Sequence, residues 1–289
     1  MSLDHLYPFE GHYLERPAGR LHYVDEGTGT PVVMVHGNPT WSFYYRNLIL
    51  KLRENHRCIA LDHLGCGFSD KPSLQKYDYQ LDSRIEDLTA LLDTVVPEGK
   101  VDLVVHDWGG AIGFGWATAF AHRIRRLVVL NTAAFPNPKD MRLPFTLWLI
   151  RNTPLGKLLV QGGNAFAVGA TRMAVKKKMP ASLRAAYTAP YDSWSNRLAT
   201  FEFVKNIPLS PKDEGYSTLT RMAEGLEQFA STPTLVCWGA QDFVFDDAFL
   251  DEWRRRLPEA EVVYYPEAGH YILEDETEAV CDRVENFLG

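Results

Sequence analysis

Asp107 lies at an abrupt change of polarity in the chain. Residues 101–105 form an apolar run that predicts a buried strand, and the glycine-rich segment 109–113 opens a stretch with helical character. A strand, a sharp turn and a helix form the setting in which many enzymes hold a nucleophilic side chain under local strain. A serine at such a turn would attack an acyl carbon, whereas a carboxylate is suited to displacing a leaving group from an alkyl carbon. We therefore predict that Asp107 is a nucleophile.

Two further residues with catalytic potential follow later predicted strands. Asp242 follows an apolar run within Gly-Ala-Gln-Asp, and His270 follows the last such run within Glu-Ala-Gly-His. Ligands bind beyond the carboxyl ends of parallel strands, so we expect both residues to meet Asp107 there. Their order predicts a triad in which Asp242 orients His270 as the general base. A helix N-cap role for Asp242 and a surface-loop position for His270 are the alternatives. Asn131 ends another strand, but an amide cannot replace the acid.

Asn38 and Trp108 are candidates for hydrogen-bond donors beside Asp107. Asn38 lies in the segment 36–41, directly after a predicted strand, and Trp108 follows the nucleophile. Their backbone amides are predicted to form an oxyanion hole. Their side chains also carry neutral N–H donors, and two such donors in an apolar cavity would suit a departing halide. The alternative is that Asn38 caps a turn and Trp108 packs in the core.

The elements that must position these residues follow from the hydrophobic pattern. Strand-like runs that are apolar throughout alternate with helical segments, which predicts a mainly parallel sheet with helices on both faces. This alternation stops after Asn131, and residues 136–230 show helical patterns, several prolines and many aromatic residues, with no buried strand. We therefore predict an α/β core formed by residues 1–135 and 231–289, with a helical cap, residues 136–230, inserted into it.

Composition and charge narrow the range of partners. The chain has a formal net charge of −7 and a sequence pI of about 5.7, so no basic field favours nucleic acid. The basic runs 176–178 and 254–256 are interpreted as solvated helix faces. No apolar run approaches the roughly 20 residues that a membrane span needs. We expect neither a metal nor a cofactor, because no ligand spacing or cofactor motif is visible.

The cellular compartment is predicted from the first residues and from the cysteines. Residues 1–10 carry neither the basic nor the apolar part of a signal peptide, so we expect no export by that route. Four scattered cysteines suggest free thiols and a reduced cytoplasmic compartment. They are Cys58, Cys66, Cys237 and Cys281.

Taken together, the motifs resemble the haloalkane dehalogenases of the α/β-hydrolase superfamily. The resemblance rests on His-Asp-Trp-Gly-Gly at 106–110, His-Gly-Asn-Pro-Thr-Trp at 36–41, Asp242 and His270. It covers nearly the whole chain and is strongest to the third dehalogenase subfamily. It implies an α/β-hydrolase fold, with a mostly parallel central sheet flanked by helices and an inserted helical cap. The β-lactone decarboxylases of bacterial long-chain olefin biosynthesis share these motifs, and the segment 189–197 is especially similar to them.

The resemblance predicts hydrolytic cleavage of a carbon–halogen bond through an alkyl ester of Asp107, giving alcohol, halide and a proton. The alternative is decarboxylation of a cis-β-lactone to an olefin, which needs the same nucleophile and donors. An epoxide hydrolase, with Tyr187 and Tyr191 as proton donors, fits Asn38 less well. A non-catalytic binding protein of the same fold would give no covalent label on Asp107.

The expected partners are a small apolar halogenated or lactone substrate and a halide ion, and a homo-oligomer is compatible with the sequence. Aromatic and aliphatic residues near the predicted site are candidates for the substrate pocket. They are Phe135, Phe145, Trp148, Phe166, Leu209, Phe245 and Tyr271, and Leu147 and Leu158 are further candidates for a long tunnel.

Overall fold

The computed structural model describes residues 5–138 and 143–289 and contains one eight-stranded sheet with the order β1-β2-β4-β3-β5-β6-β7-β8. β1 and β2 pair in antiparallel fashion, β2 also pairs antiparallel to β4, and every other pairing is parallel. The prediction of a mainly parallel sheet in an α/β-hydrolase fold is thus confirmed. The strands are β1 (Gly11–Arg16), β2 (Gly19–Glu26), β3 (Thr30–Val35), β4 (His56–Leu61), β5 (Val101–Asp107), β6 (Ile124–Thr132), β7 (Thr234–Gly239) and β8 (Glu261–Tyr265).

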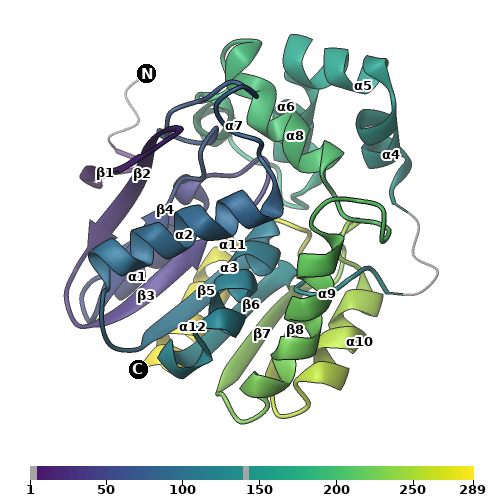
Figure 1. Ribbon diagram of the computed structural model, residues 1–289. Helices are drawn as coiled ribbons and strands as arrows, with labels where there is room; N and C mark the ends of the chain where they lie inside the picture. Colours follow the sequence, from purple (N-terminus) through teal and green to yellow (C-terminus); the bar gives the residue numbers. More distant parts are fainter. Residues whose placement is uncertain (1–4, 139–142) are drawn as a thin grey trace.

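Helices cover both faces of this sheet (Figure 1). One apolar cluster includes Val33 of β3 and packs under α2, α3, α9 and α10, and a second includes Val32 and packs under α1 and α12. Successive residues of one strand point to opposite faces, so an unbroken apolar strand is buried on both sides. The helices are α1 (Arg46–Leu52), α2 (Leu81–Val95), α3 (Trp108–Ala119), α9 (Tyr216–Gly225), α10 (Asp247–Arg256), α11 (Ile272–Asp275) and α12 (Thr277–Leu288).

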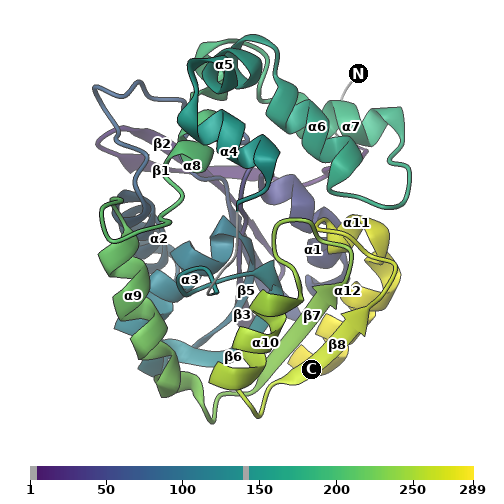
Figure 2. The same cartoon turned by 90° about the vertical axis from the view of Figure 1, so that its right-hand side faces the viewer.

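Between β6 and β7 the described part of the chain contains helices and no strand. Figures 1 and 2 show α4 to α8 as a layer beyond the carboxyl ends of the strands, whereas α9 runs beside the sheet and packs on α3. A third apolar cluster, including Leu147 and Val204, holds the layer together. The division into core and cap at residues 136 and 230 stays a prediction. The helices of the layer are α4 (Phe145–Asn152), α5 (Pro154–Lys157), α6 (Ala165–Met173), α7 (Ala181–Thr188) and α8 (Leu198–Lys205).

Within residues 5–138 and 143–289, none of the helices combines the length and apolar character needed to cross a bilayer.

Candidate active site

Asp107 occupies a sharp turn between β5 and α3. Its backbone has φ 54° and ψ −127°, a conformation that is costly for a residue with a side chain and that recurs at functional sites. Neighbouring glycines make the turn possible. A Cβ atom on Gly109 would lie 1.8 Å from the carbonyl oxygen of Val35, and one on Gly37 would lie 2.0 Å from Asp107 Oδ1. The local sequence therefore lets the backbone approach closely enough to present the carboxylate at the sheet edge.

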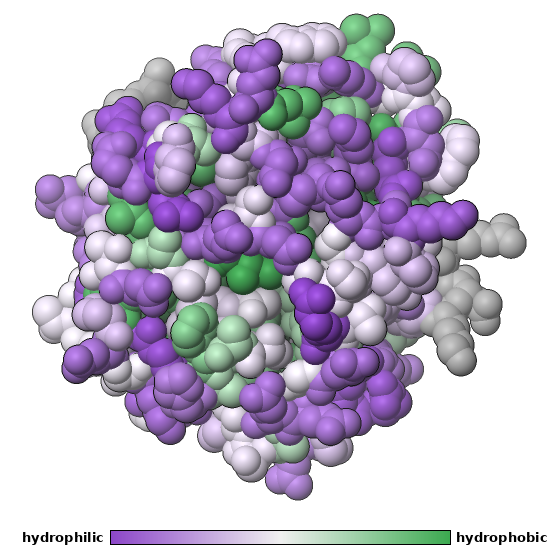
Figure 3. Space-filling model, viewed as in Figure 1, coloured by the Kyte–Doolittle hydropathy of each residue, from purple (hydrophilic) through white to green (hydrophobic). Residues whose placement is uncertain are grey.

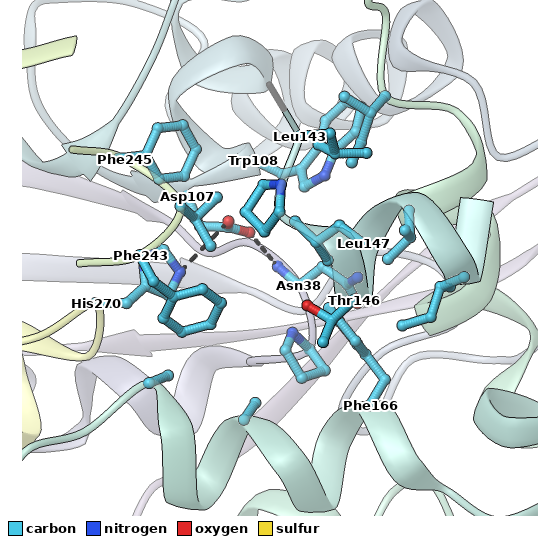
Figure 4. A pocket seen from close by; sticks show the side chains of 18 of the residues that line it. Asn38, Asp107, Trp108, Leu143, Thr146, Leu147, Phe166, Phe243, Phe245 and His270 are labelled. Atoms are coloured by element: carbon cyan, nitrogen blue, oxygen red, sulfur yellow. Dashed lines mark hydrogen bonds and ion pairs between the residues drawn. The ribbon is translucent and has the colours of Figure 1, made fainter. Parts of the chain in front are cut away.

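The structure brings Asp107, Asp242 and His270 together beyond the carboxyl ends of the strands. His270 Nε2 lies 3.4 Å from Asp107 Oδ2, and His270 Nδ1 donates a hydrogen bond of 2.7 Å to Asp242 Oδ2. All three residues are buried. Figure 4 shows the Asp107 carboxylate pointing toward His270 on one side and toward Asn38 on the other. A nucleophile, a histidine and an orienting acid in this order have the geometry of a catalytic triad.

The electrostatics of the site favour an ion pair between His270 and Asp107. Burial alone would lower the pKa of His270, but the charges of Asp242 and Asp107 and their hydrogen bonds raise it to about 10. Burial would likewise raise the pKa of Asp107, yet contact with His270 and the backbone N–H of Asn38 keeps it below its ordinary value. These contacts favour an imidazolium at His270 beside an ionised Asp107 at neutral pH.

Asp242 is itself held by neighbouring groups. Asn131 Nδ2 donates to Asp242 Oδ2 at 3.1 Å, and the backbone N–H of Val244 donates to Oδ1 at 2.7 Å. Asn131 Oδ1 in turn accepts the N–H of Gly239 at 2.7 Å. The sequence identifies Asn131 only as a residue that cannot serve as the acid, whereas in the structure its amide positions the carboxylate of Asp242. This role could have been predicted from the position of Asn131, because its amide donor lies at the end of β6, next to the end of β7.

Asn38 and Trp108 line the cavity together with Asp107. The backbone N–H of Asn38 donates to Asp107 Oδ1 at 2.5 Å, and its side-chain Nδ2 donates to the carbonyl of Thr200 at 3.1 Å. One amide hydrogen of Asn38 therefore stays free for a ligand. The Trp108 ring packs on Phe203 at 5.4 Å, and its indole N–H has no hydrogen-bond partner within the described ranges. Both side chains line the cavity, so their donors are available to an anion.

A cavity of about 310 Å³ opens above these residues, between the sheet edge and the helical layer. Its wall is mostly apolar, and its polar groups are concentrated around Asp107. Of the candidate pocket residues, four line it. They are Phe135, Phe166, Phe245 and Tyr271. Several other lining residues were not predicted from the sequence, including Leu143, Ile150, Met173 and Phe243.

Three candidate pocket residues lie elsewhere. Phe145 and Trp148 are 73% and 48% exposed, and neither they nor Leu209 belong to the described lining of the cavity. On α4 the residues Leu147 and Ile150 face inward, so residues two positions earlier lie on the outer side of the helix. The expectation that these three residues line the pocket is corrected accordingly. Leu158 is also exposed and outside this lining.

The tyrosines considered as epoxide proton donors do not reach the cavity. Tyr187 donates to Glu274 at 2.5 Å, and Tyr191 donates to the carbonyl of Thr40 at 3.3 Å. Both are buried, and neither belongs to the described wall of the cavity. Their hydroxyl groups are used within the fold, which argues against the epoxide hydrolase alternative.

Residues 5–138 and 143–289 contain no group of three or more His, Cys, Asp or Glu side chains placed to hold a metal ion. The four cysteines are buried free thiols, and burial raises their pKa to between about 11 and 12. They are therefore protonated and chemically quiet at neutral pH.

Comparison with known proteins places the chain among related enzymes. It is 52% identical to a cis-3-alkyl-4-alkyloxetan-2-one decarboxylase of Shewanella oneidensis, over 99% of this chain and 90% of that protein. It is 31% identical to haloalkane dehalogenase 2 of Mycobacterium tuberculosis, over 98% of both chains. Among solved structures, an ancestral haloalkane dehalogenase matches with a TM-score of 0.86 and 25% identity, covering 96% of this chain and 97% of that one.

The family model of the alpha/beta hydrolase fold matches residues 30–277. That range spans every strand from β3 to β8 and includes Asn38, Asp107, Asp242 and His270. The predicted resemblance is confirmed at this level, and the chain belongs to the alpha/beta hydrolase fold family.

Proposed function

We propose that the protein is a decarboxylase of cis-3,4-dialkyl β-lactones that releases an olefin and carbon dioxide. The observation that carries the proposal is the 52% identity, over almost the whole chain, to a protein with that activity in its name, against 31% to a dehalogenase. A second decarboxylase, from Xanthomonas campestris, is 45% identical over 94% of the chain. The resemblance of the motifs favoured dehalogenation over decarboxylation, and the identities reverse that order. The motifs alone do not distinguish the two activities, because both groups of enzymes share them.

The first step uses the Asp107 carboxylate as the nucleophile. It attacks the ring carbon C4 of the lactone, and the bond from C4 to the ring oxygen breaks. An alkyl ester of Asp107 forms, and the former ring carboxyl group becomes a free carboxylate on C3. The side-chain N–H groups of Asn38 and Trp108 stabilise the negative charge that develops on the former ring oxygen as its bond to C4 breaks. The imidazolium of His270 lies beside the same reacting atoms.

The second step restores the enzyme without water. The bond between C3 and the carboxylate carbon breaks, and its electron pair forms the C3–C4 double bond. The C4–oxygen bond to Asp107 breaks at the same time, which returns the carboxylate and releases carbon dioxide. The apolar cavity supports this step, because a carboxylate is less stable there than in water and loses carbon dioxide more readily.

A direct assay tests the proposal. The purified protein is incubated with a cis-3,4-dialkyl oxetan-2-one, and the olefin is measured by gas chromatography with mass detection. Asp107→Asn should form no olefin, while the matched exposed variant Asp93→Asn keeps full activity. Undiminished olefin formation by Asp107→Asn would remove the proposed nucleophile, and no olefin from the wild-type protein would remove the proposed reaction.

Haloalkane dehalogenation is the second candidate, and the paired N–H donors of Asn38 and Trp108 favour it. In that reaction ester formation removes the charge of Asp107, one of the two charges that raise the pKa of His270. His270 releases its proton, and the neutral imidazole then deprotonates a water molecule that attacks the carbonyl carbon of the Asp107 ester. Turnover in heavy-oxygen water separates the two reactions, because hydrolysis places the heavy isotope in the Asp107 carboxylate and decarboxylation does not. Mass analysis of the Asp107 peptide after turnover of a bromoalkane, and separately of the lactone, reads out the difference.

A further inference from the structure

The outward side of the helical layer exposes large apolar side chains. We call this surface the outer helical face, and it lies on α4, α5, the short helix 158–162 and α6. Part of it is visible as green atoms at the upper edge of Figure 3, over the region of α5. Its apolar members are Phe145 (73% exposed), Trp148 (48%), Leu155 (52%), Leu158 (57%), Leu159 (38%) and Met173 (52%).

These side chains belong to one continuous surface. The rings of Phe145 and Trp148 stack with centroids 6.0 Å apart and an interplanar angle of 16°. α4 packs on α5, α5 on the helix 158–162, and that helix on α6. The outer helical face therefore extends over several helices, and large apolar patches on a folded protein mark interaction sites.

The segment that contains the outer helical face carries only positive side-chain charge, and one of its cations, Arg151, pairs with Asp213 from outside the segment at 2.6 Å. Residues 143–191 contain seven Lys and Arg residues and no Asp or Glu. Because the whole chain has a net charge of −7, the other residues together carry −14. Lys157 lies between Leu155 and Leu158 in the sequence, and Arg172 precedes Met173. Cations interleaved with exposed aromatic and aliphatic residues are typical of surfaces that bind anionic lipid.

A cationic cleft adjoins this face at the end of α6. It has a volume of about 350 Å³, and Arg172, Lys176, Lys177, Lys178 and Arg184 contribute to its lining. The backbone N–H groups of Lys176 and Lys177 donate to the buried carboxylate of Asp275 at 2.8 to 3.0 Å. The turn is thereby fixed while its lysine side chains stay exposed. Lys177 pairs with Glu276 at 3.0 Å, and the remaining positive charge suits a lipid phosphate.

The outer helical face also reaches the active-site cavity. Leu159 and Met173 are exposed on this face and line the cavity at the same time. An apolar substrate dissolved in a bilayer could therefore pass between the helix 158–162 and α6 without crossing water. This substrate route rests on the proposed function, whereas binding of the face to lipid does not.

We propose that the outer helical face docks the protein on the surface of an anionic lipid bilayer. Lys157 and the cationic cleft bind headgroup phosphates, and Trp148 and its apolar neighbours enter the interface. A bilayer fits this surface better than a protein partner, because most of its cations, including Lys157, Arg172, Lys176 and Lys178, are exposed beside large apolar side chains, and only Arg151 and Lys177 pair with acids, Asp213 and Glu276. The contact is peripheral and needs no spanning helix.

Flotation of the full chain with vesicles tests the charge component. We expect binding to vesicles of phosphatidylglycerol and phosphatidylcholine, and loss of binding in about 1 M salt, where the Debye length is about 3 Å. Lys157→Glu and Arg172→Glu should each lower the partition coefficient by at least about fivefold. Lys100→Glu is the matched control, because Lys100 is exposed and immediately precedes β5, at the opposite end of the sheet from the helical layer. It should leave binding unchanged.

The apolar component needs a second pair of variants. Trp148→Glu and Leu158→Glu should abolish flotation, whereas Leu50→Glu, at an exposed position of α1, should not. The proposal is overturned if the wild-type protein does not float with vesicles at low salt, or if Lys100→Glu and Lys157→Glu lose equal amounts of vesicle binding. It is also overturned if the wild-type protein self-associates instead of floating and Trp148→Glu abolishes that self-association. Olefin formation from a short soluble lactone is measured in parallel, so failure of the docking and failure of the proposed reaction are distinguishable.

Discussion

The carboxyl edge of the sheet and the helical layer above it contribute to the same cavity in different ways. At the sheet edge, each reactive side chain is buried and held by hydrogen bonds, as Asp242 is by Asn131 and Val244. In the layer, the wall consists of apolar side chains such as Leu147 and Phe166, whose contacts have no fixed direction. The comparison indicates that the sheet edge determines the chemistry and the layer determines which substrates reach it.

The shared motifs of decarboxylases and dehalogenases fit this division. Both of the proposed reactions begin with attack of the Asp107 carboxylate on an alkyl carbon, and this chain is similar to members of both groups. They differ in whether water then attacks the ester. Access of water depends on the apolar walls, so we expect the helical layer to contribute to the outcome.

Loss of the nucleophile should have the largest effect of any single change. Asp107→Asn keeps the size of the side chain but removes its charge, so we expect olefin formation to fall to background. The matched change in the helical layer, Thr146→Val, alters one polar group of the wall and should change the rate by less than about tenfold. Equal losses of olefin formation in the two variants would contradict the idea that the sheet edge determines the chemistry and the helical layer selects the substrate. Single-turnover olefin yield measures both.

Removal of the orienting acid should have the next largest effect. Asp242→Asn is expected to lower the kcat of olefin formation by about 10²-fold, because the amide removes a negative charge that helps to keep His270 protonated beside the reacting atoms. Asn131→Ala should act in the same direction but more weakly, since Asp242 keeps its bond from the Val244 N–H. Wild-type kcat in Asp242→Asn would show that the 2.7 Å contact with His270 is structural only.

The sequence predicted the sheet edge well and the wall of the layer only in part. Apolar runs predicted the strands β3 to β8, and strand ends in a parallel sheet must meet, so Asp107, Asp242 and His270 could be placed together. The polar strand β1 (Gly11–Arg16) was not predicted, because it has no such run. The inward face of α4 was harder to predict, because Phe145 and Trp148 are as apolar as Leu147 and Ile150. Helical periodicity shows which residues share a face, but tertiary packing decides which face is buried.

The ion pair at the sheet edge should make stability depend on pH. The pKa of His270 is raised from 6.5 to about 10, so its contribution is complete below pH 6.5 and is lost as the pH rises through about 10. We therefore expect the free energy of unfolding to fall between neutral pH and pH 10. Urea denaturation at several pH values measures this, and His270→Gln should show a flatter dependence over the same interval. A parallel decline in both proteins would assign the effect to other groups.

Two neighbouring residues of α4 give the finest test of the comparison. Leu147 is 6% exposed and lines the cavity, whereas Trp148 is 48% exposed on the outer helical face. Leu147→Ala should cost about 2–5 kcal/mol of unfolding free energy, and it should shift the preference toward bulkier substrates by enlarging the cavity. Trp148→Ala should cost no more than about 1 kcal/mol and leave turnover of a short soluble substrate unchanged. Thermal unfolding measures the change in stability, and turnover of substrates with different alkyl chain lengths measures the change in preference. A changed chain-length preference in Trp148→Ala would mean that the outer helical face also shapes the cavity.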